Sequence, residues 1–100
     1  MAAVREMGGS LSARTWTRGA ECVATEVDGA LVLLDLEGGM YFALNGPAAD
    51  VWLALESPRS EKALVEALTA KYAVESDHCA RSVAVLLKDL AVKGLAKPAA

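Results

Sequence analysis

Two neighbouring side chains, His78 and Cys79, have the types that nucleophilic catalysis uses. In that chemistry a histidine takes the proton of the thiol, so the two groups must face each other. Consecutive residues of a helix point about 100° apart and do not meet in this way. His78 is therefore interpreted as an exposed residue in the first turn of a helix. Since the sequence also lacks GxSxG, HExxH and phosphate-loop motifs, we predict that the chain is not an enzyme.

The cysteines and the single histidine do not have the spacing of a metal site. Cys22 and Cys79 lie far apart, and neither belongs to a CxxC pair. A structural zinc needs about four ligands, so we expect no metal and no cofactor. The favoured interpretation is two reduced cysteines in or near the core, and the sequence leaves a disulfide between them open. The acids of the predicted helices are interpreted as solvated charges: Glu61, Glu66, Asp77 and Asp89.

Composition and charge limit the class of protein. The chain has 100 residues, 54% of them hydrophobic, and we predict a flexible N-terminal arm over 1–14 and one domain over 15–97. The net charge of −3 argues against nucleic acid as the main partner, because phosphate binding needs a basic surface. No run approaches the roughly 20 apolar residues of a membrane span, and no apolar signal segment is present. We therefore expect a cytoplasmic protein with no nucleic acid and no membrane partner.

The elements that would position a site begin with three strands. Val23, Thr25 and Val27 alternate with the residues between them, which is the period of a half-buried strand. Asp28-Gly29 then gives a strong hairpin turn signal, and a glycine pair marks a second turn. The strands are predicted at 21–27, 31–36 and 40–44. Joined by tight turns, they would form an antiparallel meander.

Three helices are predicted to follow. Asn45 is a good N-cap for the first and Ser60 for the second, while the third begins at 75–77. The third helix would end at Gly94, with Leu95 in contact with Leu90 as a Schellman motif requires. The apolar stripes expected to face the core are Ala48, Val51, Trp52 and Leu55, then Leu64, Ala67, Leu68 and Tyr72, then Cys79, Val83, Leu86, Leu87 and Leu90. Strands followed by helices indicate an α+β domain.

Two parts of this arrangement could bind another chain. The third strand, 40–44, is an edge of the meander and contains no charge, proline or bulge, so it is a template for an added strand. The alternative is that Trp16 or the N-terminal arm covers it. The second part is an outer stripe of the third helix, which would form the other wall of a groove. Its members are His78, Ser82, Val85, Asp89 and Val92, flanked by Arg81 and Lys88.

The sequence resembles the PqqD family over roughly residues 22–97. The resemblance rests on the runs VLLD at 32–35, GMYFALN at 39–45 and AADVW at 48–52, and continues through the helix at 60–72 and the ending at 86–95. The junction of strand, Leu-Asn, helix and Trp is its most specific part. This resemblance implies a winged-helix-like domain, with a three-stranded antiparallel sheet followed by a three-helix bundle.

The resemblance also implies a function. PqqD-like domains are recognition elements for the precursor peptides of ribosomally made, modified natural products. A leader peptide is expected to bind as an extra strand along the third strand and to contact the third helix. A free-standing copy of this length is similar to the recognition protein of lasso-peptide pathways. Its partners would be the precursor leader peptide and a separate leader peptidase or other modifying enzyme, and the protein would be a monomer or weak dimer.

The predicted peptide-binding residues come from the strand and the helix: Met40, Tyr41, Phe42, Ala43, Leu44, Arg81, Ser82, Val85, Leu86, Lys88, Asp89 and Val92. Backbone bonds would come from Tyr41 and Ala43, or from Met40 and Phe42. Phe42 and Leu44 are expected to face the core, against Trp52. Two other hypotheses remain, a winged-helix DNA-binding regulator and a homodimer that pairs third strand with third strand.

Overall fold

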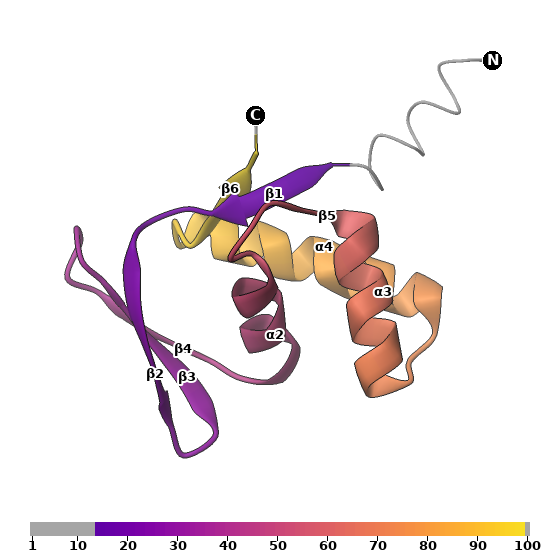
Figure 1. Ribbon diagram of the computed structural model, residues 1–100, viewed down its shortest axis with the longest axis horizontal. Helices are drawn as coiled ribbons and strands as arrows, with labels where there is room; N and C mark the ends of the chain where they lie inside the picture. The colour runs from indigo at the N-terminus through magenta and orange to yellow at the C-terminus, as the bar shows by residue number, and fades with distance from the viewer. Residues whose placement is uncertain (1–13, 100) are drawn as a thin grey trace.

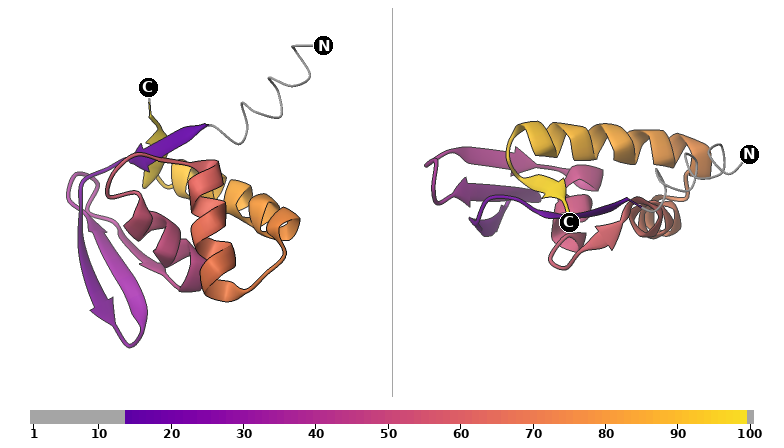
Figure 2. Two further views of the ribbon diagram at one scale, coloured as in Figure 1. Left: turned by 45° about the vertical axis from the view of Figure 1, so that its right-hand side comes forward. Right: turned by 90° about the horizontal axis from the view of Figure 1, so that it is seen from above.

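The chain folds into two small antiparallel sheets and three helices within residues 14–99, the part that this computed structural model describes. In chain order the elements are β1 (Thr15–Arg18), β2 (Cys22–Val27), β3 (Ala30–Asp35), β4 (Tyr41–Leu44), α2 (Gly46–Ala54), β5 (Arg59–Ser60), α3 (Glu61–Tyr72), α4 (Ser76–Val92) and β6 (Ala96–Pro98). The sheet β2–β3–β4 lies at one end of the molecule beside α2, and the sheet β5–β1–β6 lies against the helices (Figures 1 and 2). The α+β class is confirmed, while the predicted N-terminal arm falls outside the described residues except for Arg14.

The meander forms because its turns carry residues that tolerate positive φ. Asp28 (φ 52°) and Gly29 (φ 83°) both occupy the left-handed region that a two-residue hairpin turn requires. In the second turn the Asp35 carboxylate accepts a 3.0 Å hydrogen bond from the Glu37 N–H, and Gly39 has φ 69°. The predicted order of three antiparallel strands is confirmed.

Strand β2 is not half-buried, so that expectation is wrong. All of its residues after Cys22 are exposed. Val23, Thr25 and Val27 lie on the face of the sheet opposite the fully buried Leu33. The reason is that α2 packs against β3, and β2 lies beyond it as an edge strand with its apolar side toward solvent.

The helices bury most of their predicted apolar stripes in one core. These side chains join Leu33 and Leu44 of the sheet: Val51, Trp52, Leu55, Leu64, Leu68, Cys79, Val83, Leu87 and Leu90. Two residues of the stripe predicted for α3, Ala67 and Tyr72, are instead exposed. The prediction fails at Tyr72 because its hydroxyl turns to a polar partner on α2.

That polar partner is Asp50, which links α2 to the end of α3. Its carboxylate accepts hydrogen bonds from the Tyr72 hydroxyl and from Lys71 Nζ, the latter at 2.9 Å. Partial burial alone would raise the pKa of Asp50, but the hydrogen bonds from Tyr72 and Lys71 outweigh it and lower this pKa below its ordinary value.

Removing the Asp50 charge is expected to lower the stability of the folded protein by an amount that depends on pH. A carboxyl with a lowered pKa in the folded state stabilises that state above the unfolded pKa of about 4, and the stabilisation is lost as the pH falls through the folded pKa. Asp50→Asn should therefore lower the melting temperature by a few degrees near neutral pH and change it little in strong acid. Thermal unfolding at both pH values checks this, with Asp28→Asn in the exposed hairpin turn as the control. An equal loss at both pH values would contradict the assignment.

The second sheet was not predicted from the sequence. Strand β1 pairs with β5 on one side and β6 on the other, and Trp16 in β1 is only 7% exposed. The Trp16 indole N–H donates to the Glu61 carboxylate at 2.8 Å. Strand β5 has two residues and β6 has three, so neither is long enough to show the two-residue period of a strand.

The end of β1 meets the end of α4. The helix closes in the predicted Schellman motif, in which the Leu95 N–H donates to the Leu90 carbonyl at 2.8 Å and Gly94 has φ 77°. The Gly19 N–H donates to the Leu95 carbonyl at 3.0 Å. A Cβ atom at Gly19 would lie 2.3 Å from the Gly94 carbonyl oxygen, so only glycine fits this crossing.

Arg18 fixes the orientation of α2. Its guanidinium lies over the Trp52 ring, 3.6 Å from the ring centroid, and its Nε donates to the Trp52 carbonyl at 3.1 Å. The Trp52 carbonyl near the helix end also accepts from the Leu55 N–H at 3.2 Å, so Arg18 adds a second hydrogen bond to it while it packs on the ring. The second sheet therefore positions the helix that follows β4.

Candidate functional site

Strand β4 presents one unpaired backbone edge. The Asp35 N–H donates to the Met40 carbonyl at 2.8 Å, so the backbone of Met40 faces β3. Backbone groups alternate between the two sides of an antiparallel strand, and Phe42 therefore also faces β3. The N–H and C=O groups of Tyr41 and Ala43 point away from the sheet. Of the two backbone sets considered from the sequence, the Tyr41 and Ala43 set is the one directed outward.

No other described strand lies along this edge. Strands β1, β5 and β6 form the separate sheet, and β4 pairs with β3 alone among residues 14–99. Trp16, one of the two covers considered, sits in that separate sheet. The other cover, the N-terminal arm, lies outside the described residues.

The side chains of β4 divide between the two faces of the sheet. Leu44 is buried and Phe42 partly buried, and both pack in the core that contains Trp52, as expected. Tyr41 is 71% exposed and Met40, just before the strand, is 57% exposed. An added strand would therefore meet backbone along the edge of β4 and the side chain of Tyr41 on the outer face.

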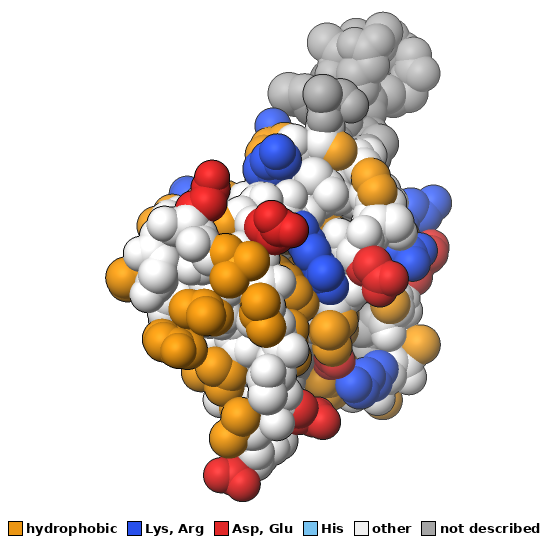
Figure 3. Space-filling model, turned by 60° about the vertical axis from the view of Figure 1, so that its left-hand side comes forward, with side chains coloured by type: hydrophobic (Ala, Val, Ile, Leu, Met, Phe, Trp, Pro, Cys, Tyr) orange, Lys and Arg blue, Asp and Glu red, His pale blue; other side chains and the backbone are white. Residues whose placement is uncertain are grey.

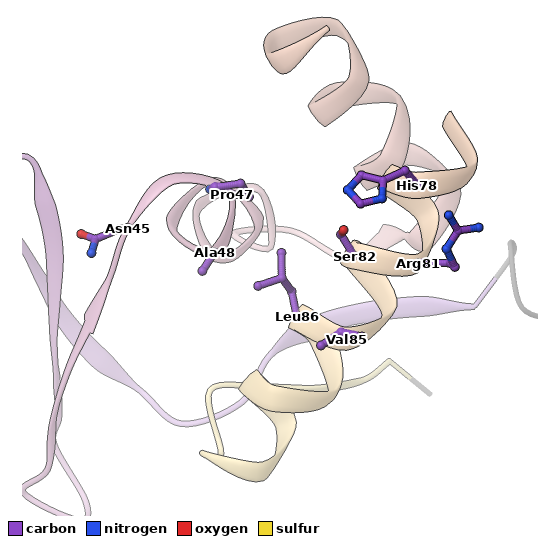
Figure 4. A pocket seen from close by; sticks show the side chains of 8 residues that line it. All are labelled: Asn45, Pro47, Ala48, His78, Arg81, Ser82, Val85 and Leu86. Carbon is purple, nitrogen blue, oxygen red and sulfur yellow. The ribbon is translucent and has the colours of Figure 1, made fainter. Parts of the chain in front are cut away.

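A pocket of about 500 Å³ begins where β4 ends and extends to α4 (Figure 4). Ala48 on α2 and Leu86 on α4 point toward each other, and the His78 ring is directed toward Pro47 (Figure 4). The lining residues are Asn45, Pro47, Ala48, His78, Arg81, Ser82, Val85 and Leu86. The pocket is thus walled by the start of α2 on one side and by the first half of α4 on the other.

The lining chemistry suits an apolar side chain attached to a polar backbone. Pro47, Ala48, Val85 and Leu86 supply apolar walls and Ser82 supplies a hydroxyl, while the Asn45 amide is directed away from α4 (Figure 4). Arg81 is the one lining residue with a permanent charge, and no lining residue is acidic. A chain that continues past the edge of β4 could place one apolar side chain here while its backbone remains paired.

The predicted site residues fall into three groups. Arg81, Ser82, Val85 and Leu86 come together in the pocket. Met40 to Leu44 lie on or beside the free edge strand. Lys88, Asp89 and Val92 are exposed on the later turns of α4 and do not line the pocket, and Asp89 pairs with Lys93 at 2.9 Å.

Four pocket residues were not among the predicted site residues: Asn45, Pro47, Ala48 and His78. Asn45 was interpreted as a helix N-cap and Ala48 as part of a core-facing stripe, while His78 was assigned to the outer stripe of the third helix but left out of the predicted binding residues. The sequence did contain a signal for His78 as a pocket residue. His78, Ser82 and Leu86 follow one another at four-residue spacing, which places them on one side of α4. The contribution of α2 had no such signal, since it depends on the angle at which α2 leaves the sheet.

A second cavity, of about 590 Å³, lies between α3 and α4. Its lining includes the acids Glu61, Glu66 and Asp77 and the bases Lys62 and Arg81. It is slightly larger than the first, but no strand of the β2–β3–β4 sheet contributes to it. The pocket at the end of β4 is therefore the better candidate, because it continues an edge that can pair with another chain.

Metal-ligand clusters and cysteines were the remaining chemical groups to locate among the described residues. Within 14–99, no three His, Cys, Asp or Glu side chains are grouped to hold a metal ion. Cys22 and Cys79 are free thiols, the first half-buried and the second buried. Burial raises the pKa of the Cys22 thiol, with the Asp35 carboxylate acting in the same direction against Arg18, so this thiol is held protonated. No helix in this part of the chain is long and apolar enough to cross a membrane.

The fold and the pocket together define a small winged-helix-like α+β domain in which a free sheet edge leads to a pocket on the last helix. A model of the family described as coenzyme PQQ synthesis protein D (PqqD) matches residues 30–96. The chain belongs to the PqqD family.

Two solved structures are similar to this chain. One is titled "TbiB1 in Complex with the TbiA(beta) Leader Peptide"; it is 30% identical, with a TM-score of 0.73 over 84% of this chain and 98% of the other. The other, titled "Lasso peptide synthetase B1 complexed with the leader peptide", is 31% identical, with a TM-score of 0.71 over 83% of this chain and 98% of the other. A comparison with curated proteins gives no match.

Proposed function

We propose that this chain binds the leader segment of a ribosomally synthesised precursor peptide as an added strand beside β4. The observation that carries the proposal is the free edge of β4, with Tyr41 and Ala43 directed outward, next to an apolar pocket on α4. Membership of the PqqD family and the leader-peptide complexes of the two similar structures support it. The module would then deliver the peptide to a leader peptidase or other modifying enzyme of a lasso-peptide pathway, as a binding protein and not a catalyst.

In this proposal backbone pairing gives affinity and the pocket gives specificity. Main-chain hydrogen bonds at Tyr41 and Ala43 do not depend on the peptide sequence, whereas the pocket accepts only side chains that fit its apolar walls. Arg81 at the pocket favours a peptide without positive charge at that point. Lys88, Asp89 and Val92 would contact a peptide that continues along the rest of α4.

Nothing in the structure favours the DNA-binding alternative. In a winged-helix reader the hairpin and the last helix would approach phosphates, so they should be basic. Here the hairpin turns carry Asp28 and Glu37, and no Lys or Arg occurs from Gly19 to Pro58. The last helix is not uniformly basic, because its exposed bases, Arg81 and Lys88, are accompanied by exposed aspartates. Binding to random duplex DNA serves as a negative control in the experiment below.

The test is titration of the purified protein with a fluorescent leader peptide from the precursor gene beside its own. We expect a dissociation constant between micromolar and nanomolar, which corresponds to roughly −8 to −12 kcal/mol. Val85 is 67% exposed, so the carboxylate of Val85→Glu stays solvated in the free protein and would be buried only by the bound peptide, and affinity should fall at least about ten-fold. Val74→Glu is the matched control, because Val74 is also exposed but lines neither cavity.

Two further results complete this test. Val92→Glu measures how far the peptide extends along α4, since Val92 is 82% exposed and lies beyond the pocket. If Val85→Glu binds the leader as tightly as the native protein, the pocket is not part of the site. If the native protein does not bind the leader at all, the proposed function is wrong.

A further inference from the structure

The outer face of the β2–β3–β4 sheet has an unusual composition for a surface in contact with solvent. An antiparallel sheet with one side on the core usually carries polar residues on the other. Here the register groups eight residues on the outer face, and none of them is charged: Val23, Thr25, Val27, Ala30, Val32, Leu34, Tyr41 and Ala43. The charged side chains of these strands, Glu26 and Asp35, lie instead on the face that carries the core residue Leu33.

This outer face is open in the described part of the chain. Val23 is 51% exposed, Val27 48% and Tyr41 71%. Figure 3 shows hydrophobic side chains gathered on this side of the molecule, with acidic side chains at the margins of the patch. Single exposed apolar residues need no explanation, but a contiguous apolar face bordered by polar groups is typical of an interaction surface.

The charges around the face select the kind of partner. The segment from Gly19 to Pro58 contains no Lys or Arg, so all ten basic residues of the chain lie elsewhere. Three acids lie at the ends of this sheet, Glu21 before β2 and Asp28 and Glu37 in the two turns, while the other two acids lie on the opposite face. An acidic border repels nucleic acid and anionic membranes, and it repels the same face of a second copy. It fits a protein surface with an apolar centre and Lys or Arg around it.

The outer face alone is too small for a stable protein interface, and a bound peptide would enlarge it. Three strands about 4.8 Å apart and about 20 Å long cover only roughly 300 Å², well below the roughly 800 Å² per partner of a stable interface. A strand added beside β4 would place alternate side chains on this same face, next to Tyr41 and Ala43. The loaded protein thus offers a wider surface, part of which belongs to the peptide.

We propose that the outer face of the β2–β3–β4 sheet is the docking surface for the enzyme that processes the bound peptide. This inference rests on the proposed function. The enzyme is expected to present an apolar patch with a basic border, to bind the peptide-loaded protein more tightly than the empty one, and to bind less tightly as salt is added.

The test separates this surface from the leader site by a substitution far from β4. Val23→Lys places a positive charge on the outer face of β2, and Ala24→Lys places the same charge on the next residue, whose side chain lies on the other face. The probe is the purified leader-processing enzyme encoded beside the chain, measured by biolayer interferometry with and without leader peptide. Val23→Lys should weaken enzyme binding at least about ten-fold while Ala24→Lys leaves it near native, because a like charge opposes the basic border.

Leader affinity is measured separately on both variants and should be unchanged, since Val23 and Ala24 lie on the strand farthest from the β4 edge. Native leader binding together with native enzyme binding in Val23→Lys would overturn the inference and leave the proposed function standing. Absence of leader binding in the native protein would overturn the proposed function itself. The inference would also be overturned if gel filtration showed a native dimer that Val23→Lys dissolves, or if the native protein bound vesicles of anionic lipid.

Discussion

Replacing Ala43 with proline is expected to reduce affinity for the leader peptide at least about ten-fold while the protein stays folded. The Ala43 N–H is directed away from β3, so its loss removes no hydrogen bond from the sheet. It does remove one of the two outward donors that an added strand would use. The proline ring also occupies the space where the backbone of that strand must approach.

The chain supplies a matched control on its opposite edge. The Leu36 N–H donates to the Glu21 carbonyl at 3.1 Å, so by alternation the backbone of Ala24 points outward from β2 as that of Ala43 does from β4. Both residues are exposed alanines in edge strands. Ala24→Pro should therefore leave leader affinity unchanged. Fluorescence titration of both variants, with circular dichroism to verify folding, checks this, and equal losses in the two would mean that the leader does not pair specifically with β4.

The largest loss of stability is expected from Gly19→Ala. The added Cβ would lie 2.3 Å from the Gly94 carbonyl oxygen and 3.3 Å from the Ala96 nitrogen, and both are backbone atoms. The crossing of β1 over the end of α4 must then open, which strains the hydrogen bond from the Gly19 N–H to the Leu95 carbonyl. Overpacking of this kind costs about 1–3 kcal/mol, or roughly 4–8 °C of melting temperature per kcal/mol in a domain of this size.

Gly38→Ala is the matched control for that loss. A Cβ at Gly38 would meet the Asp35 carboxylate at 2.9 Å, but this is the end of a flexible side chain that can turn away. Its melting temperature should stay close to native. Thermal unfolding followed by circular dichroism compares the two variants, and equal stability of Gly19→Ala and the native protein would show that the crossing tolerates a side chain.

The sequence was sufficient to predict the elements that have strong local signals. Asp28-Gly29 marked the hairpin, Ser60 marked the start of α3 with its hydroxyl accepting from the Ala63 N–H at 3.0 Å, and Gly94 marked the end of α4. These are features of turns and caps, which a few consecutive residues determine. The short strands β5 and β6 carried no comparable signal, because their pairing with β1 depends on contacts distant in sequence.

The candidate site likewise combines features that have a local sequence signal with features that depend on the folded structure. The edge strand and the face of α4 follow from periodicity, so Tyr41, Ala43, Ser82 and Val85 could be selected from the sequence. Which backbone groups point outward could not, because alternation along β4 needs one fixed hydrogen bond as its reference. Periodicity also could not predict which side of β2 faces solvent. Alternation indicates two faces but not which of them the helices cover.

The sheet β2–β3–β4 has consequences for solubility as well as recognition. Both of its outer strands are unpaired within residues 14–99, and β4 has no charged residue to discourage pairing while β2 has Glu26. The β4 edge of one molecule can pair with the β2 edge of the next. Repeated head-to-tail pairing of this kind produces an open filament unless the rotation between neighbouring molecules closes a ring. The peptide that occupies β4 would end such a filament before it begins. Under the proposed function, a bound leader peptide would therefore also protect the protein from self-association.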